Sequence, residues 1–338
     1  MAGRALVLVT IFVVTVLATQ AASKSAPSGA GQAGGQRVHL SRATSVLNAR
    51  LSIGRVTDHA PASPVSPIVN ELVSSTPPSI SHVNRARHPN LRRNGSYPIG
   101  ALSAANPSGR APPSGNAMAG YTLEYVNSFT GTSLPHGWVT YSGTPGGDPG
   151  GQFSSSHVTV SGGLLQINTW QDPAYNNQWV TGGLCQCGLA RTYGAYFVRS
   201  RVTGSGPAAV ELLWPVAPVW PPEIDFSETG GTTSASSATL HYTSASDFVQ
   251  KKLTIDMTKW HTWGVIWTPA SVVYTVDGRT WGSVSAASEI PRQPMTLDLQ
   301  QQTWCASGWA CPTSPQSLQV DWVAEYAPSS SGGSRSTK

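Results

Sequence analysis

One stretch near the middle of the chain, WPPEIDFSETGG, restricts the fold more than any other. Glu223 and Asp225 alternate with Ile224 and Phe226, so a β-strand places the two acids on one face and the two apolar residues on the other. Glu228 lies an odd number of residues beyond Glu223, and strict alternation therefore turns it to the apolar face. One extra residue, inserted as a β-bulge, returns it to the acidic face. We predict a bulged strand that presents three carboxylates together.

Three like charges on one strand face repel one another, so a purely structural strand gains nothing from them. A site that needs a proton donor and a carboxylate nucleophile gains a great deal. Only 11% of the chain is charged, which makes three acids within six residues a marked concentration. The stretch therefore predicts a catalytic site, with an ordinary acidic strand as the weaker alternative.

The sequence around this stretch is typical of an all-β protein. Glycine (34), proline (26) and tryptophan (12) are abundant, which suits short strands and turns around an aromatic-lined groove. Alternating runs predict a hairpin over residues 158–168, a long strand over 193–202 and a last strand over 319–326. Asp277 and Gly278 form a strong hairpin-turn signal. We predict one two-sheet β-sandwich over residues 119–327.

The first residues are typical of an exported protein. Arg4 precedes an uncharged apolar run from Ala5 to Ala18, and small residues follow. This is the pattern of a secretory signal peptide, and the run is short for a membrane span. We predict that residues 1–22 are a signal peptide and that the protein is secreted. An uncleaved membrane anchor is the alternative.

Two segments are predicted to be disordered, residues 23–118 and residues 328–338. The first is rich in Ser, Ala, Gly and Pro and has no sustained period. It holds ten Lys and Arg residues against two acids, whereas residues 119–338 hold ten against fourteen. The basic linker is therefore either a passive tether or an arm that contacts the cell wall or a membrane surface. The predicted domain has no basic stripe with interleaved aromatics, which argues against nucleic-acid binding.

Four cysteines in an exported chain favour disulfide bonds. Cys305 and Cys311 bracket a loop rich in Gly and Trp that can close locally. Cys185 and Cys187 lie two residues apart on one strand face. We favour the pairs Cys305–Cys311 and Cys185–Cys187, although four cysteines allow three pairings. A zinc site is the weaker alternative, because no histidine lies at ligand spacing from these thiols.

The pattern Glu223-x-Asp225-x-x-Glu228 resembles the bulged active-site signature of glycoside hydrolase family 16, the laminarinase and lichenase family. The similarity extends over residues 121–327, and its segments follow the family's order. It departs at Phe197, where the family often carries Glu, and in the two cysteine pairs. The resemblance implies an all-β jelly roll of the concanavalin A type with a concave substrate cleft. The further segments that carry it are residues 192–199, 260–269 and 320–323.

The resemblance also implies the roles of the three acids. Glu223 is the expected nucleophile and Glu228 the expected acid/base of retaining glycoside hydrolysis, with Asp225 between them. Asp225 can form a hydrogen bond with Glu223 and hold it in position. We expect the nearby negative charge to raise the pKa of Glu228 and keep it protonated near neutrality.

Aromatic and polar residues around the acids are the candidates for substrate binding, because sugar rings stack on flat aromatic side chains. Gln186 is expected to face the groove, since its flanking cysteines face away, with a merely solvent-facing glutamine as an equal alternative. Arg199 is expected to reach the groove, and pairing on the sheet surface is the alternative. For Trp179 and Trp304, packing between the sheets is an equal alternative. The complete predicted set is Trp214, Trp220, Trp179, Gln186, Arg199, His241 and Trp304.

The expected chemistry needs no cofactor. The resemblance implies one structural calcium ion away from the cleft, with the Asp321 carboxylate and the backbone carbonyl near Gly163 as oxygen ligands. We expect a monomeric endo-β-glucanase that cuts β-1,3 or mixed β-1,3-1,4 glucan. The alternatives are a transglycosylase, which shares the covalent intermediate, and a lectin-like carbohydrate-binding domain. The intact set of three carboxylates argues against a protein that only binds sugar.

Overall fold

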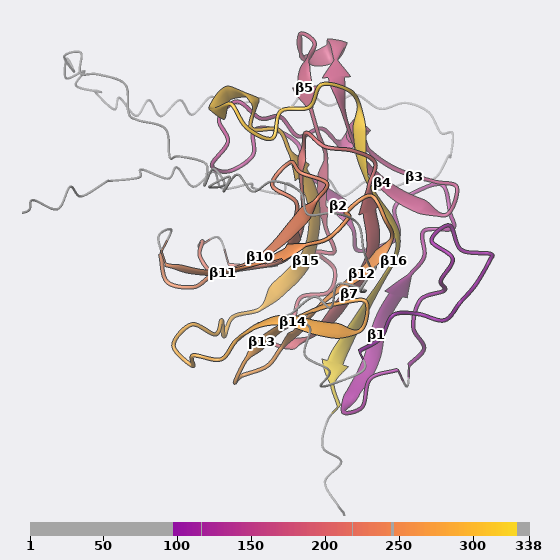
Figure 1. The fold of residues 1–338 in the computed structure, drawn as a ribbon, viewed down its shortest axis with the longest axis vertical. Coiled ribbons are helices and arrows are strands. Elements are labelled where there is room, and N and C mark those ends of the chain that lie inside the picture. Colours follow the sequence, from indigo (N-terminus) through magenta and orange to yellow (C-terminus); the bar gives the residue numbers. More distant parts are fainter. Residues whose placement is uncertain (1–96, 116, 218, 245–246, 330–338) are drawn as a thin grey trace, which may run out of the picture. The chain divides into compact units, whose positions relative to one another are not determined.

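Two antiparallel β-sheets, packed face to face, make up the described part of the chain (Figure 1). The structure is a computed structural model, and it describes residues 97–329 except residues 116, 218, 245 and 246. The predicted signal peptide, most of the predicted linker and residues 330–338 lie outside these residues. Within the described part, the predicted all-β two-sheet sandwich is confirmed.

The first sheet has seven strands and carries the acidic stretch on β9. Its strands lie in the order β11-β10-β9-β8-β15-β6-β2, so β9 has a neighbour on each side. The bounds are β2 Val139–Thr140, β6 Gly183–Cys185, β8 Ala208–Pro215, β9 Glu223–Glu228, β10 Ala235–His241, β11 Phe248–Thr254 and β15 Met295–Gln302.

The second sheet has nine strands, in the order β14-β13-β12-β7-β16-β4-β3, with β1 paired to β16 and β5 paired to β4. The bounds are β1 Tyr121–Asn127, β3 Val158–Ser161, β4 Leu164–Asp172, β5 Gln178–Val180, β7 Gly194–Val202, β12 His261–Trp267, β13 Val272–Val276, β14 Arg279–Val284 and β16 Gln316–Pro328. The helices of the described residues are three short 3₁₀ turns, Ser155–His157, Pro173–Tyr175 and Cys305–Ser307. Among the described residues, no helix has the length and apolar character needed to cross a membrane.

The predicted strands and turns are present where the local signals were strong. Gly162 and Gly163 join β3 to β4. Asp277 and Gly278 join β13 to β14, with φ angles of 47° and 78°. Positive φ at both turn residues is what a tight hairpin turn requires, and Gly and Asp tolerate it well. The final strand, β16, is longer than predicted because it pairs along its length with β1, β4 and β7.

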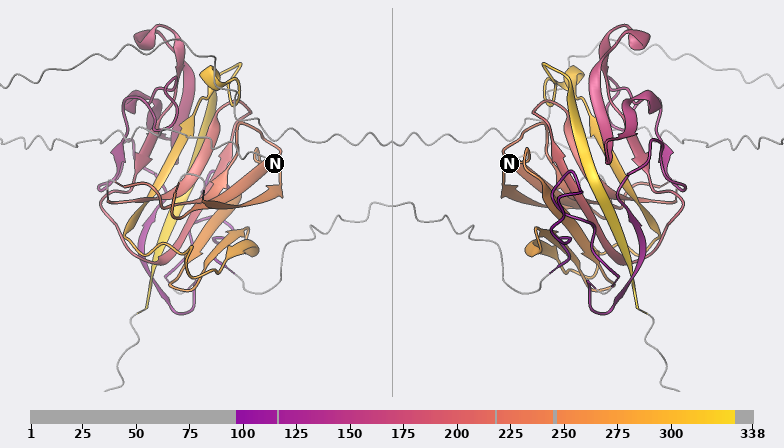
Figure 2. Two further views of the ribbon diagram at one scale, coloured as in Figure 1. Left: turned by 90° about the vertical axis from the view of Figure 1, so that its left-hand side faces the viewer. Right: turned by 90° about the vertical axis from the view of Figure 1, so that its right-hand side faces the viewer.

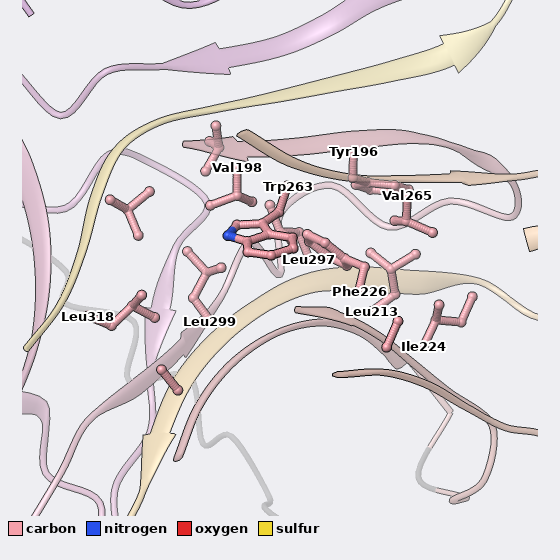
Figure 3. Close-up of a cluster of buried hydrophobic side chains, with 14 of the residues drawn as sticks. Tyr196, Val198, Leu213, Ile224, Phe226, Trp263, Val265, Leu297, Leu299 and Leu318 are labelled. Atoms are coloured by element: carbon pink, nitrogen blue, oxygen red, sulfur yellow. The ribbon is translucent and has the colours of Figure 1, made fainter. Parts of the chain in front are cut away.

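The two sheets bury one hydrophobic core between them (Figure 3). Ile224 and Phe226 of β9 enter this core and are fully buried, as the alternation predicts. Trp263 of β12 and Tyr196 of β7 enter the same cluster from the nine-stranded sheet. Because these apolar side chains fill the space between the sheets, the acids of β9 face outward, away from the second sheet.

The boundary that we predicted between a disordered linker and the domain, at residue 119, is wrong. Residues 97–115 and 117–118 pack on the outer face of the nine-stranded sheet, along β16 (Figure 2, right). The indole of Trp322 donates a hydrogen bond to the carbonyl oxygen of Arg110 (3.1 Å), and the hydroxyl of Tyr326 donates one to the carbonyl oxygen of Ser114 (3.0 Å). Tyr97 and Met118 pack against a second, smaller apolar cluster there.

This segment, residues 97–118, is called the outer strap below. It escaped prediction because it forms no strand and shows no period, and its contacts are with residues far away in the sequence, from 91 positions for Arg199 to 212 positions for Trp322 and Tyr326. At Gly100 the backbone has φ of 78°, and an added Cβ would lie 2.1 Å from the carbonyl oxygen of Ala111. Only glycine fits such a close crossing. Glycine in this segment suggested a flexible linker, but Gly100 has a packing role in the folded domain.

Candidate active site

A β-bulge in β9 brings the three acids to one face of the seven-stranded sheet. Asp225 is the Cα partner of Thr239 and Glu228 that of Ser237, so three steps along β9 match two along β10. The pairing with β8 shifts at the same place. One extra residue is thus present between Asp225 and Ser227, as predicted, and the shift returns Glu228 to the side of Asp225. We call this side of the sheet the acidic face.

Glu223 is held by hydrogen bonds at the start of β9. The indole Nε1–H of Trp220 donates to Oε2 of Glu223 at 2.6 Å. Burial raises the pKa of Glu223 to about 7, and the charge of Glu228 adds to this, while the hydrogen bonds from Trp220 and Asp225 lower it. Glu228 therefore lies close enough to Glu223 for the two charges to interact.

Asp225 lies between the other two acids and is the most strongly affected of them. It is 4% exposed, and burial raises its pKa well above the ordinary value. The charges of Glu223 and Glu228 and the hydrogen bond with Glu223 raise the pKa of Asp225 further. The last proton of the trio therefore stays on Asp225, which can donate it to Glu223. Of Glu223 and Asp225, Glu223 therefore ionises first.

Glu228 closes the strand next to a positive charge. Burial raises its pKa, and Lys252 of β11 opposes this. Glu228 and Lys252 are both Cα partners of Ser237, from the two sides of β10. We expected the nearby negative charge to raise the pKa of Glu228, but the cause of the raised pKa is burial.

Two predicted aromatic residues lie beside the acids. Trp214 of β8 is 38% exposed, and Trp220 contacts Glu223 directly. His241 is the Cα partner of Glu223 across β10, and its Nε2 lies 3.9 Å from Oδ2 of Asp225. The side chains of His241 and Trp220 are in ring contact, with centroids 5.3 Å apart. These three predicted residues therefore share the acidic face with the catalytic candidates.

Three further residues of this face were not predicted from the sequence. Phe248 is 51% exposed and lies 5.6 Å from the ring of His241. Asp298 of β15 accepts hydrogen bonds from the hydroxyls of Tyr141 and Thr296. The signal for Asp298 was present in the sequence, since it alternates with Leu297 and Leu299 just as Asp225 alternates with Ile224 and Phe226. Phe248 and Tyr141 gave no such signal, because only strand pairing brings them here.

Gln186 does not face the groove, and this prediction is wrong. It is 3% exposed and forms a hydrogen bond with Tyr125. Cys185 is the Cα partner of Asp298 and shares the acidic face, so Gln186 points to the interior, the side of the buried Leu184. The alternation that we predicted between the cysteines and Gln186 exists, but we assigned its two sides the wrong way round.

Arg199 also lies away from the acids, contrary to our prediction. It is on β7 of the nine-stranded sheet, and its Nε–H donates to Oγ of Ser108 in the outer strap (3.1 Å). Its Nη1 lies 3.7 Å from Oδ1 of Asp277 and donates to Oγ1 of Thr262 (3.3 Å). Arg199 thus anchors the strap to the second sheet.

The last two predicted tryptophans lie on β5 and in the loop after β15. Trp179 is on β5, which pairs with β4 of the nine-stranded sheet. Trp304 stacks on Trp309, with ring centroids 4.9 Å apart, in the loop after β15. This loop is closed by the disulfide Cys305–Cys311. A role in sugar binding for Trp179 and Trp304 stays a prediction.

Both favoured disulfides are present in the structure. Cys305 pairs with Cys311 and Cys185 with Cys187. The chain has four cysteines and none of them is free, which leaves no thiolate for the zinc alternative. The second disulfide lies beside Asp298, at the edge of the acidic face.

The residues predicted to bind calcium lie beside the outer strap. Oδ2 of Asp321 accepts hydrogen bonds from the backbone N–H (3.1 Å) and the hydroxyl of Ser108, and the charge of Arg199 acts on the same carboxylate. Gly163 approaches Pro107, the neighbour of Ser108. Oδ1 of Asp321 is buried without a hydrogen-bond partner, and one carboxylate oxygen is far short of the six to eight oxygens that calcium prefers. These residues do not form a calcium site by themselves.

The chemistry of the acidic face does not require a metal ion. Side-chain atoms of Glu223, Asp225 and His241 lie within 4.8 Å of one another. The hydrogen bonds and shared proton described above already account for the proximity of these groups. We therefore assign no metal to them.

Comparison with known proteins agrees with this geometry. The family model of glycosyl hydrolases family 16 matches residues 153–324. No curated protein sequence matches the chain.

Three solved structures illustrate the similarity in fold. An endo-β-1,3-glucanase from Pyrococcus furiosus is 18% identical, with a TM-score of 0.54 over 62% of this chain and 95% of that one. A laminarinase from Rhodothermus marinus is 19% identical, with a TM-score of 0.54 over 62% and 98%. A LamA variant from Z. galactanivorans, in complex with laminaritriose and laminaritetraose, is 17% identical, with a TM-score of 0.54 over 61% and 99%. At this identity the three structures support the fold alone.

Proposed function

The chain belongs to family 16 of the glycosyl hydrolases, and from this membership we propose that it is a retaining endo-β-glucanase. The proposed substrates are β-1,3 and mixed β-1,3-1,4 glucans, which agrees with the laminarinases and β-1,3-glucanases among the similar structures. The observation that carries the proposal is the bulge in β9. It brings a hydrogen-bonded carboxyl, Glu223, and a half-buried carboxyl with a raised pKa, Glu228, to one face of one strand.

In the first step, a carboxylate oxygen of Glu223 attacks the anomeric carbon while the glycosidic C–O bond breaks. Glu228 gives its proton to the departing oxygen, so the leaving sugar is released as an alcohol. Two features support these roles. Trp220 and Asp225 both donate hydrogen bonds that favour the ionised form of Glu223, and burial favours the protonated form of Glu228.

In the second step, Glu228 takes a proton from water, and the water oxygen attacks the anomeric carbon. The bond to Glu223 breaks, and its carboxylate is restored. Asp225 keeps its proton throughout and orients Glu223, which is consistent with its strongly raised pKa. Because attack occurs twice, the product keeps the anomeric configuration of the substrate.

The test compares the purified protein with two variants on laminarin, lichenan, xyloglucan and agarose, with product analysis by chromatography and NMR. Glu223→Gln should lower kcat at least roughly a thousandfold while the protein stays folded. The matched control is Glu289→Gln, an acid-to-amide change in the connection between β14 and β15, which should leave kcat unchanged.

Each other result points to a different function. Wild-type turnover by Glu223→Gln would contradict the assignment of the nucleophile. Longer oligosaccharides among the products would indicate transglycosylation, and sugar binding without turnover by the wild-type protein would indicate the lectin-like alternative. Inverted products would contradict the double displacement.

We also infer that the protein is secreted. The apolar run after Arg4 has the pattern of an export signal. The two disulfides are of the kind that persists in oxidising compartments. Expression in a secreting host, with N-terminal sequencing of the protein in the medium, tests both the export and the cleavage after residue 22.

A further inference from the structure

A fourth carboxyl, Asp298, lies on the acidic face and has no role in the reaction described above. It is the Cα partner of Leu212, which is in turn the Cα partner of Asp225. Asp298 therefore lies in the same row as Asp225, two strands away, at roughly 10 Å between backbones. It is 5% exposed, so its charge is poorly screened by water, and it lies within electrostatic reach of Glu223.

Two hydroxyl groups hold Asp298 in place. Tyr141 donates to its Oδ2, and Thr296, two residues earlier on β15, donates to its Oδ1 at 2.8 Å. Both carboxylate oxygens are thus satisfied in the ionised form. A buried acid supplied with two donors is built to hold a charge, or to titrate, rather than to fill space.

The chain is shaped locally so that Tyr141 can reach this acid. Tyr141 follows β2, and its backbone N–H donates to the carbonyl oxygen of Gly183 at 2.7 Å. Its ring crosses β6 directly above Gly183, where an added Cβ would lie only 2.5 Å from the ring. Phe153 packs against the other side of the ring, with centroids 5.7 Å apart. The Tyr141–Asp298 contact therefore requires a glycine at position 183 of β6.

We propose that Asp298, held by Tyr141 and Thr296, is a positioning residue that controls the ionisation of Glu223 through its charge. The proposal rests on the function proposed above, in which Glu223 must be ionised to attack. The titratable groups that act on Asp298 are Tyr141, through its hydrogen bond, and Glu223, through its charge. Asp225 and Glu228 also act on Glu223, and His241 is its Cα partner. Asp298 differs from these groups in its position, because it lies on β15, which is separated from β9 by β8.

The consequence can be given a direction and a size. Burial raises the pKa of Asp298 to about 7, and the charge of Glu223 contributes to this, so the two acids titrate in the same range. Interaction between two charges acts on both, so the charge of Asp298 also resists ionisation of Glu223. Glu223 lies two residues before Asp225 on β9, so the backbones of Asp298 and Glu223 are roughly 12 Å apart. Two charges at roughly 12 Å and an effective dielectric of about 20 shift each other by about one pH unit, and by about half of that when they share protons.

The first test is the pH profile of kcat/KM on laminarin, measured from pH 4 to pH 9. Asp298→Asn should move the acid limb to lower pH by roughly half to one unit, because Glu223 then ionises without the opposing charge of Asp298. Tyr141→Phe should move it in the same direction, because Asp298 without its donor stays neutral to higher pH. The matched controls, Glu289→Gln and Tyr175→Phe, should leave the limb in place.

The second test does not depend on turnover. The side-chain carboxyl of Glu223, assigned by comparison with Glu223→Gln, is titrated by carbon-13 NMR in the wild-type protein and in Asp298→Asn. Its pKa should fall in the variant. Coincident titration curves, or a loss of activity that is uniform across pH, would overturn the inference. Failure of the wild-type protein to hydrolyse any glucan would overturn the proposed function, and the NMR titration would still decide the role of Asp298.

If Asp298→Asn does not fold, Tyr141→Phe decides the outcome, since it removes one hydroxyl and keeps the ring over Gly183. An acid limb unchanged in folded Tyr141→Phe would then contradict the proposal.

Discussion

Single donors determine which acid of the trio carries charge. Burial raises the pKa of Glu223, Asp225 and Glu228 in the same direction. Glu223 differs because it accepts two hydrogen bonds that lower its pKa, one from the indole N–H of Trp220 and one from the carboxyl of Asp225. The charges of Glu223 and Glu228 raise the pKa of Asp225 further. The sharing of roles among three similar residues is therefore decided by their neighbours.

The variant Trp220→Phe tests the effect of the indole N–H on the ionisation of Glu223. The variant keeps an aromatic ring but loses the N–H, and a hydrogen bond to a charged group contributes about 1.5–3 kcal/mol. The pKa of Glu223 should rise by roughly one unit, and the acid limb of kcat/KM should move to higher pH. This is the opposite direction to the shift expected for Asp298→Asn. Trp214→Phe is the matched control, and a limb that moves equally in both variants would contradict the account.

At the scale of elements, the sequence predicted what depends on neighbours along the chain. The bulge in β9 followed from the odd spacing of Glu228, and the turn at Asp277 followed from its own residue pair. Gln186 and Arg199 were misplaced for a different reason. Alternation shows that two sides of a strand differ, but which side meets the other sheet depends on segments far away in the sequence. Arg199 contacts Ser108, 91 positions earlier.

The outer strap provides an element-scale prediction. A variant that begins at Tyr97 should melt at the temperature of the full chain, whereas one that begins at residue 119 should melt lower. The shorter variant exposes Trp322 and leaves Asp321 and Arg199 without Ser108. Each unsatisfied buried group costs about 1–3 kcal/mol, so the free energy of unfolding should fall by roughly 2–5 kcal/mol.

Calorimetry of the two shortened variants and the full chain measures this difference. Ser108→Ala in the full chain serves as the graded comparison, because it removes one hydroxyl and leaves the rest of the strap. Equal melting temperatures for the two shortened variants would show that the strap contributes nothing to stability.

At the scale of the whole molecule, buried acids make stability depend on pH. Burial raises the pKa of Glu211 to about 8, with a hydrogen bond from Ser200 acting against this. Burial likewise raises the pKa of Glu325 to about 8, and the charge of Arg191 opposes it. The folded protein keeps these protons at pH values where the unfolded chain has released them. The free energy of unfolding therefore falls as pH rises from the ordinary value of 4.5 toward about 8.

Glu211→Gln should flatten this dependence. The amide stays neutral at every pH and retains an oxygen for the hydroxyl of Ser200. Between about pH 5 and pH 8 the variant should gain stability over the wild-type protein by up to roughly 1.4 kcal/mol per pH unit. Urea unfolding at several pH values measures the slope. The free energy of unfolding of Glu289→Gln should depend on pH as that of the wild-type protein does. The same dependence in Glu211→Gln would contradict the assignment of the pH effect to Glu211.

The extra residue in β9 also has a consequence for how the strand can change without loss of the site. Removing one codon between Asp225 and Glu228 would make every spacing among the three acids even, so that a regular strand without a bulge would present the same three carboxyls on one face. A descendant of this sequence can therefore lose the bulge and keep the site, provided that one residue is lost with it. A regular strand that kept the present odd spacing would instead turn the third carboxyl toward the apolar interior.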